Sequence, residues 1–251
     1  MISTGDDLFL IGAGLLAGVV GTAGGITSLI SYPALLAVGL PVLRANVTNI
    51  LSLVTCWPGA AMASRPELTG KGPWLRRWAP VTAAGGVVGS ALLILTPPGV
   101  FSDVVPYLLV LAAVGLLIQP RLSSWQEGRP SGRNRFLLPC GLFAVSTYNG
   151  YFGAGAGVML LALLLFTVDR QIAISNALKN MLVGVSTVVS AALFVALGRV
   201  DWSAAIPLAA GMFLGSTIGP RIARALPGGV LRWLVALTGI GLAARLWFAP
   251  L

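Results

Sequence analysis

The residue with the clearest chemical potential is a lysine inside an apolar segment. Lys179 lies about eight positions into the run 172–197, and Asn176 and Asn180 flank it. A buried cation needs a compensating negative charge. Three interpretations are open: a bound anion, a pair with Asp169 one loop earlier, or a side chain that reaches solvent along its apolar stem.

Amides and hydroxyls recur at the start of a corresponding segment in the first half. The chain reads RANVTN at 44–49 and SNALKN at 175–180, which aligns Asn46 with Asn176 and places Asn49 near Lys179 or Asn180. Thr48 adds a hydroxyl. Such groups can donate to a bound oxyanion, or they can cap a helix. Both interpretations stay open for the asparagines.

Two glycine-rich breaks precede these segments. They read GTAGG at 21–25 and GAGAG at 153–157. Glycine lets the backbone leave helical geometry, and a helix that restarts presents unpaired N–H groups, which favour anions. The alternative is a pair of tight turns that only pack. The predicted substrate-binding residues are Lys179, Asn176, Asn180, Asn46, Thr48, Asn49, Thr22, Gly24, Gly25, Asn149, Gly155 and Gly157.

The elements that position these residues are membrane helices. The chain has 251 residues, of which 57% are hydrophobic and 9% are charged, whereas soluble domains carry about 25% charged residues. Apolar runs recur at close to the roughly 20 residues that span a bilayer. They are too long for barrel strands. The predicted fold class is therefore an all-α polytopic membrane protein.

Several classes of function are disfavoured. The net charge is +9, but the basic residues cluster in loops as the positive-inside rule predicts, so no nucleic-acid partner is expected. The chain has no histidine and two separated cysteines, and no metal or cofactor is predicted. It contains no HExxH motif and no carboxylate cluster, so no catalytic residue is predicted and the chain is not expected to be an enzyme.

The two halves of the chain resemble each other. Both contain AAGxxxGS, with Gly85 and Gly211 lying 126 residues apart, and GxxG begins at Gly18 and again at Gly150, 132 residues later. We predict a first transmembrane repeat at 1–120, a basic cytoplasmic linker at 121–135 and a second repeat at 136–251. Repeats with broken helices are typical of transporters, with the substrate site near the midplane.

Charge placement indicates how the breaks cross the membrane. Apart from Lys179, fifteen lysines and arginines remain. Single broken spans would divide them ten to five between the two sides. Re-entrant hairpins would divide them twelve to three, leaving only Arg44, Arg199 and Arg245 outside. The positive-inside rule therefore favours hairpins plus three crossings per repeat, which makes the repeats inverted.

Five segments together resemble the TauE/SafE sulfite exporter family, also called the toluene sulfonate uptake permease family. They are GVVGTAGGITSLISYPALL at 18–36, RANVTN at 44–49, YFGAGAGVMLL at 151–161, SNALKN at 175–180 and DWSAAIPLAAGMFLGSTIGPRIA at 201–223. The first break is less glycine-dense than the family's usual GxGGG.

The resemblance implies a multi-pass transporter of the bacterial inner membrane. Its expected substrate is sulfite, sulfoacetate or another organosulfonate, and its expected direction is export. The partners are then a small anion and the lipid bilayer, with no oligomeric state predicted. The alternative is a non-transporting membrane scaffold or assembly factor.

Overall fold

The computed structural model describes residues 4–125, 136–197 and 200–223, and these residues form helices and no strand. The helices are α1 (Thr4–Gly24), α2 (Ser28–Ala37), α3 (Val42–Leu53), α4 (Cys56–Ala63), α5 (Arg65–Leu68), α6 (Gly72–Leu95), α7 (Pro98–Trp125), α8 (Leu137–Tyr151), α9 (Ala156–Thr167), α10 (Ile172–Ala196) and α11 (Trp202–Ala223).

Four of these helices are long and apolar enough to cross a membrane. They are α1, α6, α10 and the part of α11 from Trp202 to Gly219. Shorter apolar helices lie at Ser28–Ala37, Pro98–Val114 and Ala156–Thr167. The predicted class, an all-α polytopic membrane protein, is confirmed.

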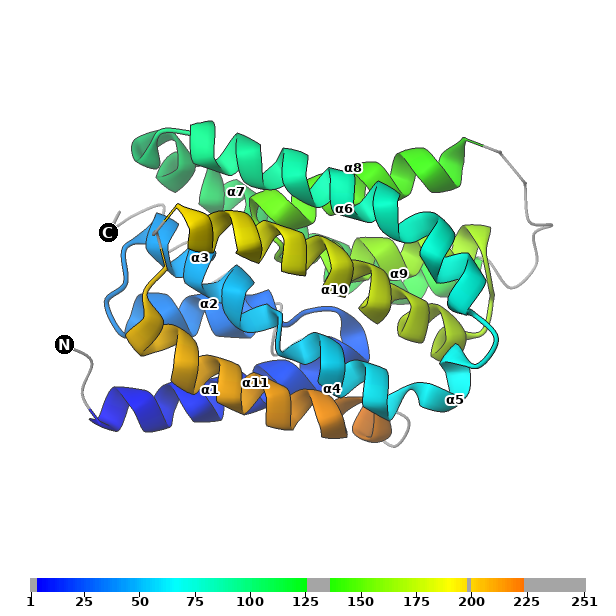
Figure 1. Ribbon diagram of the computed structural model, residues 1–251, viewed down its shortest axis with the longest axis horizontal. Coiled ribbons are helices and arrows are strands. Elements are labelled where there is room, and N and C mark those ends of the chain that lie inside the picture. Colours follow the sequence, from blue (N-terminus) through cyan, green and yellow to red (C-terminus); the bar gives the residue numbers. More distant parts are fainter. Residues whose placement is uncertain (1–3, 126–135, 198–199, 224–251) are drawn as a thin grey trace.

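The chain reverses direction at both glycine breaks. After α1 ends at Gly24, α2 runs back toward the end at which α1 began, and α9 likewise runs back along α8 (Figure 1). Gly25, Gly153 and Gly155 have φ angles of +79°, +83° and +78°. This left-handed region strains residues with a side chain, which explains why glycine occupies the reversals.

Helices from the two halves of the chain pack against each other through small residues. Helix α1 packs against α11, and α8 packs against α6. A Cβ on Gly18 would overlap the Met212 carbonyl oxygen, and one on Gly89 would overlap the Thr147 carbonyl oxygen. In each case a helix that precedes a glycine break lies against the AAGxxxGS helix of the other half.

The apolar run at 42–63 is divided rather than continuous. Helix α3 ends at Leu53 and α4 begins at Cys56. Pro58 has no N–H to donate to the Val54 carbonyl, four residues earlier, and a proline ring crowds that carbonyl. The Trp57 N–H bonds this oxygen instead, at 3.2 Å. The division places Trp57 at the start of a new helix.

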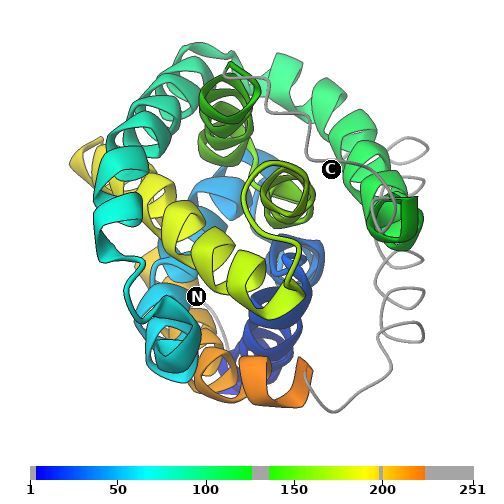
Figure 2. The ribbon, with the colours of Figure 1, turned by 90° about the vertical axis from the view of Figure 1, so that its right-hand side faces the viewer.

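Helix α10 is the most enclosed of the four long helices. Its apolar window is 61% buried, against 33–44% for the other three. Figure 2, seen along the longest axis, shows α9 near the centre of the bundle with α10 beside it. The fold therefore holds the polar residues of α10 inside the protein, away from lipid.

Candidate substrate-binding site

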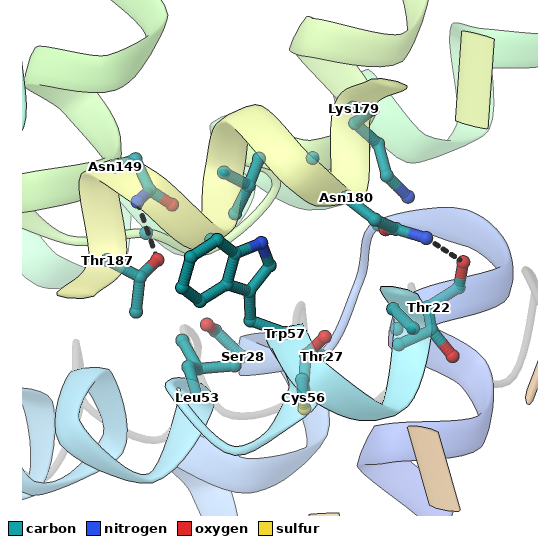
Figure 3. A pocket seen from close by; sticks show the side chains of 17 residues that line it. Thr22, Thr27, Ser28, Leu53, Cys56, Trp57, Asn149, Lys179, Asn180 and Thr187 are labelled. Carbon is teal, nitrogen blue, oxygen red and sulfur yellow. Dashed lines mark hydrogen bonds between the residues drawn. The ribbon is translucent and has the colours of Figure 1, made fainter. Parts of the chain in front are cut away.

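A cavity of about 60 Å³ lies where the two glycine breaks meet α4, α8 and α10. This is several times the roughly 10–15 Å³ that one water molecule requires. Figure 3 shows polar side chains from both halves of the chain around it. The lining residues are Gly21, Thr22, Gly25, Thr27, Ser28, Leu53, Cys56, Trp57, Ala60, Asn149, Gly153, Gly157, Lys179, Asn180, Val183, Gly184 and Thr187.

The two breaks touch each other beside this cavity. A Cβ on Gly25 would lie 2.9 Å from the Gly157 α-carbon, and a Cβ on Gly157 would lie 2.6 Å from the Gly25 α-carbon. Real Cβ atoms do not approach backbone so closely. The two glycines are 132 residues apart, as are Gly18 and Gly150. The contact therefore joins residues at equivalent places in the two halves.

Lys179 is buried in the wall of the cavity. Only 1% of its surface is exposed, and its Nζ has no hydrogen-bond partner among the described residues. Burying an unpaired ammonium is costly, so a compensating group is required when it is charged. The cavity is the space in which such a group can lie.

The Asp169 interpretation of Lys179 is wrong. The Asp169 carboxylate lies 3.9 Å from the Lys71 Nζ and accepts the Gln171 N–H at 2.9 Å. Lys179 does not reach solvent from its buried position in this structure either. The third interpretation, a bound anion, stays a prediction.

Two asparagines of α10 fix the end of α1. The Thr22 carbonyl oxygen accepts the Nδ2 groups of Asn176 at 3.0 Å and Asn180 at 3.2 Å. Asn180 also lines the cavity, whereas Asn176 does not. The Thr22 hydroxyl donates to the Gly18 carbonyl at 2.7 Å. These bonds hold the first break against the helix that carries Lys179.

Asn149 makes the corresponding link from the second half. Its Nδ2 donates to the hydroxyls of Ser186 at 2.7 Å and Thr187 at 3.1 Å. Tyr148 donates to the Ala154 carbonyl at 2.6 Å, within the second break. Both breaks are therefore fixed by side-chain bonds rather than left as open turns.

The remaining predicted residues lie outside the cavity lining. Asn46 donates to the Tyr151 carbonyl at 3.0 Å, and Asn49 accepts from the Ser31 hydroxyl at 2.5 Å. The Thr48 hydroxyl accepts the Asp201 N–H at 3.1 Å. Gly24 and Gly155 belong to the breaks but do not line the cavity. Their roles in substrate binding stay predictions.

Trp57 is the main lining residue that the sequence did not reveal. Its Nε1 is buried without a hydrogen-bond partner among the described residues. A tryptophan in an apolar membrane segment is ordinarily an interfacial anchor, so its type gave no signal. Thr187 was also missed, since a threonine within a long apolar helix is equally compatible with packing.

Comparison with known proteins places this chain in a family. The sulfite exporter TauE/SafE family matches residues 10–246. A probable membrane transporter protein, ORF9, from Sinorhizobium sp is 27% identical over 250 residues, covering 96% of this chain and 92% of the relative.

Two further relatives carry the same description. The probable membrane transporter protein YfcA of Escherichia coli K12 is 25% identical over 93% of this chain and 87% of its own length. One from Haemophilus influenzae is 26% identical over 97% of this chain and 98% of its own length. No solved structure matches the chain significantly. The chain thus belongs to the TauE/SafE family of multi-pass membrane transporters.

Proposed function

We propose that this protein exports a small sulfur-containing anion across the bacterial inner membrane. The candidates are sulfite, sulfoacetate and other organosulfonates, in keeping with the family's description as a sulfite exporter. The observation that carries the anionic part of the proposal is Lys179, whose buried ammonium faces a cavity and has no partner among the described residues.

The cavity wall favours an anion over a cation. No carboxylate is among its lining residues, which include one ammonium, the Asn180 amide and the hydroxyls of Thr27, Ser28 and Thr187. A sulfur oxyanion presents several acceptors, and hydrogen bonds to charged groups are the stronger kind. Its charge would offset the cost of burying the lysine.

The arrangement of the two halves suggests how the site could open alternately to each side. The contacts of α1 with α11 and of α8 with α6 run through glycines, which let the helix backbones of the two halves approach each other closely. In this proposal the repeats are inverted and the cavity lies near the midplane, as in other transporters with broken helices. The linker 121–135 then faces the cytoplasm.

Flux measurements on two lysine variants test the proposal. The purified protein is reconstituted into liposomes, and uptake of labelled sulfite and sulfoacetate is followed in wild type, Lys179→Ala and Lys71→Ala. Lys71 is the matched control because it is the only other lysine and its side chain is 35% exposed.

We expect wild type and Lys71→Ala to take up at least one of the two anions, and Lys179→Ala to take up neither. Wild-type-like flux in Lys179→Ala would contradict the assigned site. If the folded wild-type protein moves none of these anions, the scaffold interpretation is favoured instead.

A further inference from the structure

We propose that Trp57 is a second ligand contact that makes the cavity prefer compact oxyanions such as sulfite over anions with an organic tail. This inference rests on the proposed function and concerns the same cavity. It comes from three features of Trp57: its unused donor, its position against Gly184 and the small space that the ring leaves.

The first feature is the indole N–H. Tryptophan can donate a hydrogen bond but cannot accept one, and the same holds for the lysine ammonium. Both nitrogens are buried, and neither has a partner among the described residues, although both side chains line one cavity. Figure 3 shows the indole nitrogen on the edge of the ring nearer Lys179 and Asn180. A ligand with acceptors on two sides satisfies both donors.

The second feature is the position of the ring. A Cβ on Gly184 would overlap Cδ1 and Cγ of Trp57, so the indole rests directly on the backbone of α10. Gly184 lies five residues after Lys179, on the same helix. The break between α3 and α4 brings Trp57 to this place. The ring is therefore a wall of the cavity, packed against the helix that carries the cation.

The third feature is size. With the indole in place, the cavity measures about 60 Å³, and Leu53, Ala60 and Val183 form apolar parts of its wall. A sulfite ion presents oxygens to the donors and has no tail to accommodate. A carboxymethyl tail such as that of sulfoacetate would lie against the indole ring and these apolar side chains. The wall thus predicts a preference for the compact anion.

Binding measurements on tryptophan variants test this inference. Calorimetry with the purified full chain gives dissociation constants for sulfite and sulfoacetate in wild type, Trp57→Phe and Trp57→Ala. The control is Trp202→Phe, since Trp202 is 54% exposed and does not line the cavity.

Phenylalanine keeps an aromatic wall but removes the donor, so Trp57→Phe should weaken sulfite binding by roughly tenfold or more. Trp57→Ala opens the wall, so the preference for sulfite over sulfoacetate should fall by roughly tenfold. Trp202→Phe should match wild type in both constants.

The outcomes separate this inference from the proposed function. Unchanged sulfite affinity in Trp57→Phe and an unchanged preference in Trp57→Ala would overturn the role of Trp57. If Lys179→Ala still abolished binding in that case, the proposed anion site would stand without a role for Trp57. If wild type bound neither anion, the proposed anion site and the role of Trp57 would both be wrong. A thermal unfolding scan of each variant distinguishes a lost contact from a protein that does not fold.

Discussion

The α-carbons of Gly25 and Gly157 occupy each other's side-chain space, so neither position can carry a Cβ without moving the other break. Each glycine belongs to a different half of the chain, and both line the cavity that contains Lys179. The contact is therefore a direct link between the geometry of the two breaks and the shape of the candidate site.

Alanine at position 25 should disrupt both folding and transport. Gly25 has a φ of +79°, and the left-handed conformation costs a residue with a side chain roughly 1–2 kcal/mol before any overlap is counted. Gly25→Ala should lower the melting temperature and reduce sulfite flux in liposomes. Gly12→Ala is the control, because a Cβ there meets nothing within 4 Å. A stable, active Gly25→Ala protein would show that the breaks separate readily.

Removing the charge of Lys179 should stabilise the empty protein while abolishing its response to ligand. Replacing buried ionic groups with apolar ones of similar volume can stabilise by about 1–4 kcal/mol. Thermal unfolding in detergent, with and without sulfite, should therefore show a higher melting temperature for Lys179→Met and no shift on adding sulfite.

Lys71→Met should leave both values near those of wild type, because the Lys71–Asp169 pair is partly exposed and such pairs contribute little. A lower melting temperature for Lys179→Met would mean that the ammonium has a stabilising partner in the empty protein.

Substitutions of Asn46 and Asn180 should have different effects on sulfite affinity, although both asparagines lie in similar sequence motifs. Asn46 donates to the Tyr151 carbonyl away from the cavity, whereas Asn180 lines it. Loss of a buried hydrogen-bond partner costs about 1–3 kcal/mol. Asn46→Ala should therefore lower the melting temperature with little change in sulfite affinity.

Asn180→Ala should weaken sulfite binding as well as stability, measured by the same calorimetry and thermal scans. If Asn46→Ala lost as much sulfite affinity as Asn180→Ala, Asn46 would belong to the binding site, as its sequence pattern predicted.

Much of the candidate site could be predicted from the sequence because the residues that form it are energetically unfavourable in an ordinary membrane helix. A lysine in an apolar helix requires a special environment, and glycine clusters between apolar runs indicate a broken backbone. Lys179, Gly25 and Gly157 meet at the cavity for these reasons.

Other parts of the site depend on partners from distant segments. The role of Trp57 follows from Gly184 on another helix, and no local pattern identifies that neighbour. Polar residues one helical turn apart also have different partners. Asn46 hydrogen-bonds Tyr151 and Asn49 hydrogen-bonds Ser31, and neither asparagine lines the cavity. The division of 42–63 had a local signal, Pro58, but prolines also occur inside α2 and α6.

The orientation of the chain in the membrane gives the last prediction. Helices α1 and α2 form one reversal, which the hairpin topology requires. From the positive charge of the linker 121–135, we then expect it to lie in the cytoplasm. With Cys140 replaced by serine, single cysteines at Asp7 and Ser131 are treated with a membrane-impermeant maleimide in intact cells.

The cysteine at position 7 should react, and the one at position 131 should react only after the membrane is permeabilised. Cys56 is buried and serves as the internal background. Labelling of both positions from the same side would require each glycine break to lie within a single crossing. The two halves would then be parallel, and the contact between Gly25 and Gly157 would need an explanation other than inverted symmetry.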